Sequence, residues 1–110
     1  MKQYVVDQLR LADERRVREF LERRYGPPDL GAIFWVPLEA GLLSPLQSAH
    51  RDCQPHCAAI ELEAGRLSLE LLIRSRTRLR CSCIAYASRA QREWLIGEID
   101  AMLEELTISV

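Results

Sequence analysis

Residues 56–86 alternate apolar and polar side chains through three successive segments, and this alternation constrains the fold more than any other feature of the chain. In a β-strand, alternation at every second residue places one set of side chains on a buried face and the other set on an open face. Turn sequences at 64–65 and 75–77 separate the three segments. The pattern therefore predicts an antiparallel meander. Two rows of core residues are expected across its strands: Ala58–Leu71–Cys81 and Ile60–Leu69–Cys83.

Two longer segments with helical periodicity flank the meander. In the first, apolar residues recur every three or four positions up to Gly26, and this glycine with the two prolines after it ends the helix. The second begins at Ser88, which forms a capping box with Gln91, and it continues for about 18 residues. The same serine–glutamine spacing, at Ser44 and Gln47, starts a shorter helix.

These elements predict an α+β fold with the order β-α-β-(short α)-β-β-β-α, as a single domain over residues 1–110. The sheet is expected to be five-stranded, mixed but mostly antiparallel, with both long helices on one face, which gives two layers. Apolar runs at 4–7 and 33–38 supply the first two strands, and the helix between them would cross over in the right-handed sense. With 110 residues, 48% of them apolar, the chain can bury a core without disulfide or metal support.

The cysteine and histidine residues form the first candidate site. Thiolate and imidazole groups are the ligands that zinc prefers, and four of them close a tetrahedron. Because His50 and Cys53 share one face of the short helix, a zinc site would combine them with a cysteine pair of the meander. Cys57 lies on the other face of its strand and is left out. The resulting set is His50, Cys53, Cys81 and Cys83, with His56 and Cys57 outside it, and zinc is the cofactor that this alternative implies.

The spacing of the cysteines favours a different interpretation. Familiar zinc patterns use Cys-x-x-Cys pairs in turns, whereas Cys81 and Cys83 form Cys-x-Cys inside an alternating strand. Free cysteine packs as a small hydrophobic residue. We therefore expect Cys53, Cys81 and Cys83 to belong to the core, with metal or thiol chemistry as the alternative.

Four arginines, Arg74, Arg76, Arg78 and Arg80, alternate in a segment that contains no acidic residue. A basic ribbon of this kind can bind phosphate, nucleic acid or another anion. However, no aromatic residue lies among the arginines, and the net charge of the chain is −1. The last helix carries acidic residues towards its end, which in the predicted topology meets the arginines. We expect pairing within the fold, and anion binding is the weaker alternative.

Leu72, Ile84 and Tyr86 fall on the wet face of the meander, where helices on the other side of the sheet cannot cover them. Exposed apolar patches usually mark association surfaces. The leading functional hypothesis is therefore a non-catalytic protein-interaction or regulatory domain that forms a homodimer, or binds another protein, through its sheet. Metal binding is the first alternative and anion binding the second.

Motifs of the common enzyme classes are missing from the chain. The five glycines are scattered, so no phosphate-binding loop is present, and neither a Ser–His–Asp elbow nor a His-Glu-x-x-His helix occurs. The sequence thus favours a protein without catalytic activity. The first residues contain no apolar signal segment, and no apolar run reaches membrane-spanning length. These features predict a cytoplasmic protein with reduced cysteines and no membrane partner.

Overall fold

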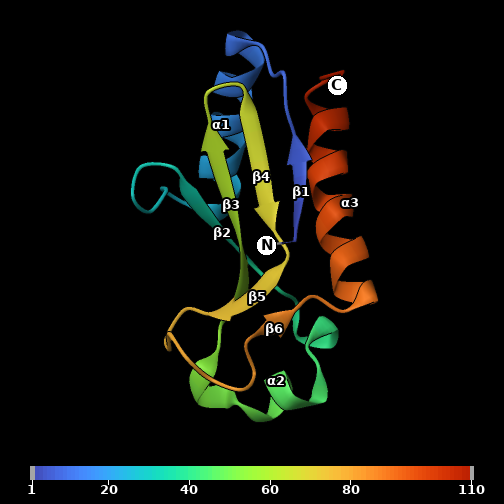
Figure 1. Ribbon diagram of the computed structural model, residues 1–110. Helices are drawn as coiled ribbons and strands as arrows, with labels where there is room; N and C mark the ends of the chain where they lie inside the picture. Colours follow the sequence, from blue (N-terminus) through green and yellow to red (C-terminus); the bar gives the residue numbers. More distant parts are fainter. Residues whose placement is uncertain (1, 110) are drawn as a thin grey trace.

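A computed structural model describes residues 2–109 and confirms the α+β class, with an antiparallel sheet and two long helices (Figure 1). The helices are α1 (Leu11–Tyr25), α2 (Pro45–Ala49) and α3 (Arg89–Glu105), with 3₁₀ turns η1 (Ala40–Leu42) and η2 (Arg51–Cys53) on either side of α2. The strands are β1 (Gln3–Val6), β2 (Ile33–Pro37), β3 (His56–Glu63), β4 (Arg66–Glu70), β5 (Leu72–Ser75) and β6 (Ala85–Tyr86). The order of elements is close to the predicted order.

Strand β3 lies at the centre of the sheet. β2 pairs with one side of β3, and β4 and β5 pair with its other side. β1 and β6 continue the sheet outward from β4 and β5. Because each of these pairs is antiparallel, no parallel pair occurs within residues 2–109. β1 and β2 lie on opposite sides of the β3–β4 pair and run antiparallel to each other, so the predicted right-handed crossover, which joins parallel strands, does not form.

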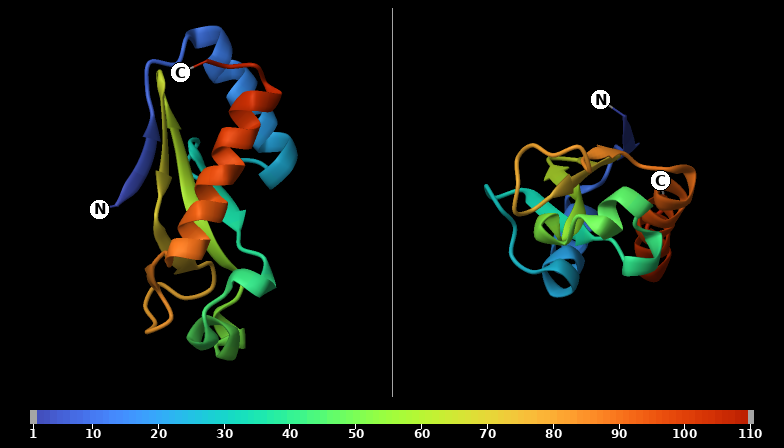
Figure 2. Two further views of the ribbon diagram at one scale, coloured as in Figure 1. Left: turned by 90° about the vertical axis from the view of Figure 1, so that its right-hand side faces the viewer. Right: turned by 90° about the horizontal axis from the view of Figure 1, so that it is seen from below.

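Both long helices cover the same face of the sheet, which confirms the two-layer prediction (Figure 2, left). Strand β3 shows the expected alternation, since Ala58, Ile60 and Leu62 are buried while Glu61 and Glu63 are exposed. Helix α1, helix α3 and strands β2, β4 and β5 complete the core. Its most deeply buried members include Val17, Leu21, Phe34, Val36, Leu67, Leu69, Ile73 and Leu95.

A change of register divides the second meander strand at Leu71. β3 pairs Ile60 with Leu69 as predicted, but it pairs Cys57 with Arg74. Two residues separate these pairs on β3, whereas four separate them on the β4–β5 side. An insertion of this kind bends the strand that carries it. The predicted row through Leu71 is therefore displaced.

The third meander strand is mostly a loop. Only Ala85–Tyr86 pairs with a neighbouring strand, as β6, and residues 76–84 have no strand structure. The rows that were expected to end in Cys81 and Cys83 are therefore wrong, although Cys83 is buried as predicted. The cause is a set of side-chain hydrogen bonds at the start of the loop, described below.

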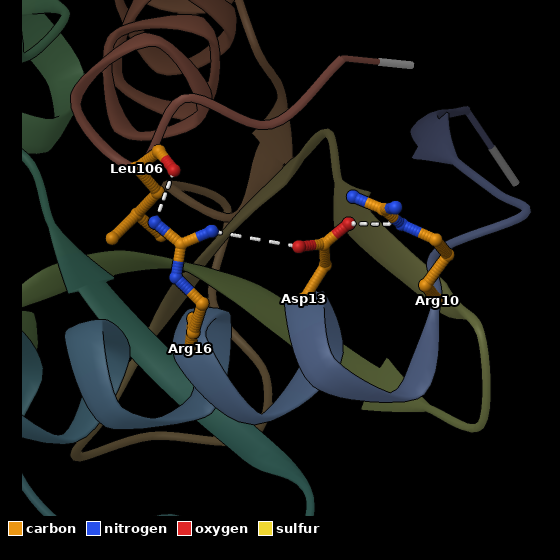
Figure 3. Close-up of polar contacts among 4 residues, drawn as sticks. All are labelled: Arg10, Asp13, Arg16 and Leu106. Atoms are coloured by element: carbon orange, nitrogen blue, oxygen red, sulfur yellow. Dashed lines mark hydrogen bonds and ion pairs between the residues drawn. The ribbon is translucent and has the colours of Figure 1, made fainter.

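Helix α3 runs away from the arginine-rich loop, beginning beside β6 and ending near the start of α1 (Figure 1). There, Arg16 of α1 donates a hydrogen bond to the carbonyl oxygen of Leu106 and lies 3.5 Å from a carboxylate oxygen of Asp13 (Figure 3). Asp13 is buried and also accepts from Nε of Arg10 at 3.0 Å. The expectation that the acidic end of α3 meets Arg74–Arg80 is therefore wrong, because the two lie at opposite ends of the molecule.

Candidate metal centre

The short helix and its 3₁₀ turn position the first two candidate ligands. His50 lies between α2 and η2, and the backbone N–H of Cys53 donates to the carbonyl oxygen of His50 at 3.1 Å. In a 3₁₀ turn, side chains three residues apart lie on the same side. His50 and Cys53 therefore face the same way, towards the loop at 76–84.

The other two candidate ligands lie in a turn instead of a strand. The backbone N–H of Ile84 donates to the carbonyl oxygen of Cys81 at 3.1 Å, which closes a turn over Ser82 and Cys83. Closely spaced cysteines in turns are typical of zinc sites. The tertiary structure thus removes the objection that strand alternation raised against this pair.

Hydroxyl groups hold the loop against η2. Oγ of Ser75 donates to the carbonyl oxygen of Cys53 and accepts from the backbone N–H of Arg78 at 3.1 Å. Oγ1 of Thr77 donates to the carbonyl oxygen of Asp52 at 2.8 Å. Such bonds offer the backbone an alternative to a strand ladder, which explains why the third strand is short. Ser75 and Thr77 were the sequence signal for this loop.

The four residues that the sequence combined come together. The ligand atoms of His50, Cys53, Cys81 and Cys83 all lie within 4.8 Å of one another. Nδ1 of His50 is 3.0 Å from Sγ of Cys81, and the sulfur atoms of Cys53 and Cys81 are 3.6 Å apart. Tetrahedral zinc with its usual Zn–S and Zn–N bond lengths needs ligand separations of roughly 3.5–3.8 Å. The cluster can therefore close around a metal with small adjustments.

The two cysteines of the turn differ in acidity. The backbone N–H of Cys83, together with neighbouring side-chain donors, lowers the pKa of Cys81 to about 6. Burial raises the pKa of Cys83 to about 12. Because the thiolate is the form that binds a metal or attacks an electrophile, Cys81 is prepared for either reaction. Cys83 becomes a thiolate only when a cation compensates its charge.

His56 stands behind the cluster as an additional polar residue. Its Nε2 lies 3.3 Å from Sγ of Cys83, its side chain is only 2% exposed, and its Nδ1 is buried without a hydrogen-bond partner in the described structure. Burial, and secondarily the charge of His50, lower the pKa of His56, so the ring is neutral. Cys57 lies outside the cluster, as the alternation predicted.

Two buried glutamines anchor the turn to the helices. Both predicted capping boxes form, with Ser44 and Gln47 at α2 and with Ser88 and Gln91 at α3. Nε2 of Gln91 donates to Oε1 of Gln47 at 2.9 Å, and Nε2 of Gln47 donates to the carbonyl oxygen of Cys83 at 3.2 Å. The two helix starts are therefore joined to each other and to the candidate site.

Arginines of the predicted anion-binding set pair within the fold where carboxylates are near. Arg74 lies 2.6 Å from Glu70, as expected for a partner on the wet face. Arg76 lies 3.3 Å from Asp29, and its guanidinium stacks over the Trp35 ring, 4.7 Å from the centroid. No local pattern predicts Trp35 and Asp29 as neighbours of Arg76, because they are distant from it in the chain.

The three residues predicted as an interface remain on the open face. Leu72 is half-buried and pairs in register with Tyr86, which is 47% exposed and lies under the amino group of Lys2. Ile84 lines a hollow of about 320 Å³ beside Trp35. These residues therefore lie on an open surface of the molecule.

Comparisons of the chain with models of known protein families, with curated proteins and with solved structures find no match. Within residues 2–109, no helix has the length and apolar character needed to cross a membrane.

Proposed function

We propose that this is a zinc-binding protein in which one Zn²⁺ joins η2 to the loop at 76–84. The observation that carries the proposal is the convergence of four ligand atoms, from His50, Cys53, Cys81 and Cys83, within 4.8 Å. Three thiolates and one imidazole in a tetrahedral arrangement favour zinc over the harder divalent cations. Four protein ligands leave no open coordination position, so the role would be structural and not catalytic.

A structural zinc would stabilise the segment between β5 and α3, which the apolar core does not hold in place. The segment from β5 to α3 contains only the short strand β6, and the loop within it has exposed side chains at 76–80. A metal would connect this segment to η2 through coordinate bonds. Cys53 and Cys83 would be its buried ligands. It would thereby fix the position of the arginine-bearing loop.

Thiol chemistry is the alternative at the same residues. The lowered pKa of Cys81 and its 3.6 Å distance from the sulfur of Cys53 are features of a reactive pair of thiols. The two functions differ in one respect that can be measured. A thiol protein would be folded and metal-free, with Cys81 open to alkylation, whereas a bound metal protects all three thiolates.

Elemental analysis of protein purified without an affinity metal tests the proposal. We expect one zinc per chain, because the four ligands form a single closed set. Cys83→Ser should lose the metal, whereas Cys57→Ser is the matched control and should keep it, since Cys57 is equally buried but outside the cluster. A folded, metal-free native protein, or equal zinc in both variants, would contradict the zinc proposal.

His56 should tune the metal site without binding the metal. Nε2 of His56 lies 3.3 Å from Sγ of Cys83, so with a metal bound its N–H would donate a hydrogen bond to the Cys83 thiolate. Loss of such an outer-shell bond typically costs 10–100-fold in metal affinity. We therefore expect His56→Leu to weaken zinc binding by about tenfold or more while the stoichiometry stays the same, measured by competition with a chromophoric chelator. An unchanged affinity would show that this bond has no such role.

A further inference from the structure

Neither long helix covers the opposite face of the sheet (Figure 2, left), and the residues at the centre of that face are apolar. Ile33 and Trp35 of β2 are half-buried there, and Trp35 pairs in register with Ala59 of β3. Two hollows, of about 320 and 100 Å³, meet at Ile33 and Ala59. The centre is thus grooved and apolar, and neither long helix covers it.

An acidic zone lies on this face towards the β3–β4 turn. Glu61 and Glu63 are both exposed, and neither forms an ion pair within residues 2–109. A hydrogen bond with Glu63 is the main cause that raises the pKa of Glu61, and repulsion between the two carboxylates adds to it. Arg66 offsets this effect only in part. The carboxylates of this zone are therefore able to form ion pairs with cations of a partner.

A basic zone lies at the other end of the face, in the loop at 76–84. Arg78 and Arg80 are exposed, and in the described part of the chain neither forms an ion pair. Arg78 lines the larger hollow together with Ile33 and Trp35, so its side chain borders the open face. Two exposed cations at this end thus match the two carboxylates at the other end, where Arg66, in register with Glu63, offsets part of the negative charge.

The two zones are far enough apart to act separately. Along β3, Glu61 is four residues from Cys57, which lies opposite Arg74 at the start of the arginine series. At about 3.3 Å per residue, Glu61 is therefore roughly 13 Å along the strand from the pair Cys57–Arg74, and the loop that carries Arg78 and Arg80 follows Arg74 in the chain. A face of this design is complementary to itself when a second copy is turned end for end.

We propose that the open sheet face is the interface of a homodimer, in which the acidic zone of each copy faces the basic zone of the other. The two-fold axis would pass near Trp35 and Ala59, which lie between the zones. The molecule measures 42 Å and 27 Å along its two longest axes, so such a face can bury roughly 800 Å² per copy, the usual size of a stable interface. A two-fold interface of this type gives a closed dimer, because each copy uses the same face and neither face stays exposed for a third copy.

A polyanion such as single-stranded nucleic acid is the competing occupant. It would gain from Arg78 and Arg80 but would meet Glu61 and Glu63 on the same face, and the chain as a whole carries a net charge of −1. A second copy instead meets opposite charge at both ends. The charge distribution therefore favours self-association.

Sedimentation velocity of the reduced, metal-loaded protein over a range of micromolar concentrations tests the proposal. We expect a dimer whose dissociation constant rises with salt. Glu61→Arg alone, or Arg78→Glu alone, sets like charges together at two symmetry-related places and should weaken the dimer about tenfold or more. Mixing these two variants should restore association, because each then meets an opposite charge at both ends. The double variant should restore it as well.

Matched controls change the same charges on the helix layer. Glu104→Arg and Arg92→Glu alter exposed residues of α3, away from the open face, and should leave the mass unchanged. A monomer at every concentration would overturn the proposal. So would a dimer whose affinity is unchanged in Glu61→Arg and Arg78→Glu, or a dimer that is not restored when these two variants are mixed. The proposal would also be overturned if the protein stayed monomeric and bound a single-stranded oligonucleotide, and if Arg78→Glu abolished that binding. The occupant of the face would then be a polyanion and not a second copy.

Zinc content measured on each variant keeps this test independent of the metal proposal. Arg78 also borders the hollow beside His50 and Cys81, so a change there has a route to the metal site. A variant that keeps its metal and loses the dimer separates the two proposals. Glu61 is remote from the cluster, so Glu61→Arg compares metal content with dimer affinity without a direct effect on the metal site.

Discussion

If zinc occupies the cluster as proposed, its chelation should lower the midpoint of thermal unfolding by roughly 15 °C or more. Zinc at 1,000 times its dissociation constant stabilises the folded state by about 4.1 kcal/mol, and a chain of this size loses about 4 °C per kcal/mol. The effect should be concentrated in one part of the molecule. The loop at 76–84 and η2 depend on the cluster, whereas the apolar core lies between the sheet and the long helices.

Amide hydrogen exchange locates this effect. After chelation, the amide of Ile84, which is bonded to Cys81, should exchange much faster, and so should that of Cys53. Amides of β3 at Ile60 and of α3 at Leu95 should remain protected and lose only the part that the fall in global stability removes, because their side chains are buried in the apolar core. Readdition of zinc provides the control. Equal exchange in the loop with and without metal would contradict a structural role for the metal.

Replacement of Phe34 by alanine should destabilise the fold by about 3–5 kcal/mol. The Phe34 side chain is 1% exposed and packs in the core between the sheet and the helices, so its truncation leaves a cavity that neighbouring side chains cannot fill. Urea unfolding of the zinc-loaded protein measures the change in the free energy of unfolding. The value lies near the whole stability of many small folds, so a partly unfolded variant at 37 °C is also an expected result.

Leu30→Ala is the matched control for Phe34→Ala. Leu30 is 93% exposed and only a few residues from Phe34 in the chain, and its truncation should change the free energy of unfolding by less than about 0.5 kcal/mol. Zinc content should remain one per chain in both variants, because neither residue touches the cluster. Similar losses of stability in the two variants would show that the core does not lie where Phe34 is buried.

Local signals in the sequence predicted the parts of the fold that depend on nearby residues. The capping boxes at Ser44 and Ser88 form as predicted, since their partners are three residues away in the chain. The alternation of β3 correctly separates Ile60 from Glu61 because the side-chain period belongs to the strand itself. What these signals omitted is that the glutamines of the two boxes contact each other.

The third meander strand shows where local pattern failed. Alternation from 78 to 86 was sufficient for a strand, but Ser75 and Thr77 bind the backbone of η2, a segment more than twenty residues away in the chain. Because of that contact the segment forms a loop instead of a strand. The prediction that Cys81 and Cys83 lie in rows of core residues across the sheet therefore no longer holds. Cys81 and Cys83 meet His50 in a shared cluster because of this turn, and not because a helix docks on a strand.

The sequence by itself predicted the two layers, the capped starts of α2 and α3, and His50, Cys53, Cys81 and Cys83 as the candidate metal set, although it favoured a core role for the cysteines. These follow from periodicity and from ligand chemistry, which are properties of residue types and their spacing. Only the tertiary structure decided that the four ligand atoms lie within 4.8 Å of one another and that an acidic and a basic zone share the open face. Such distances depend on strand register and on where a loop is held, and the hydrogen bonds that decide both join residues far apart in the chain.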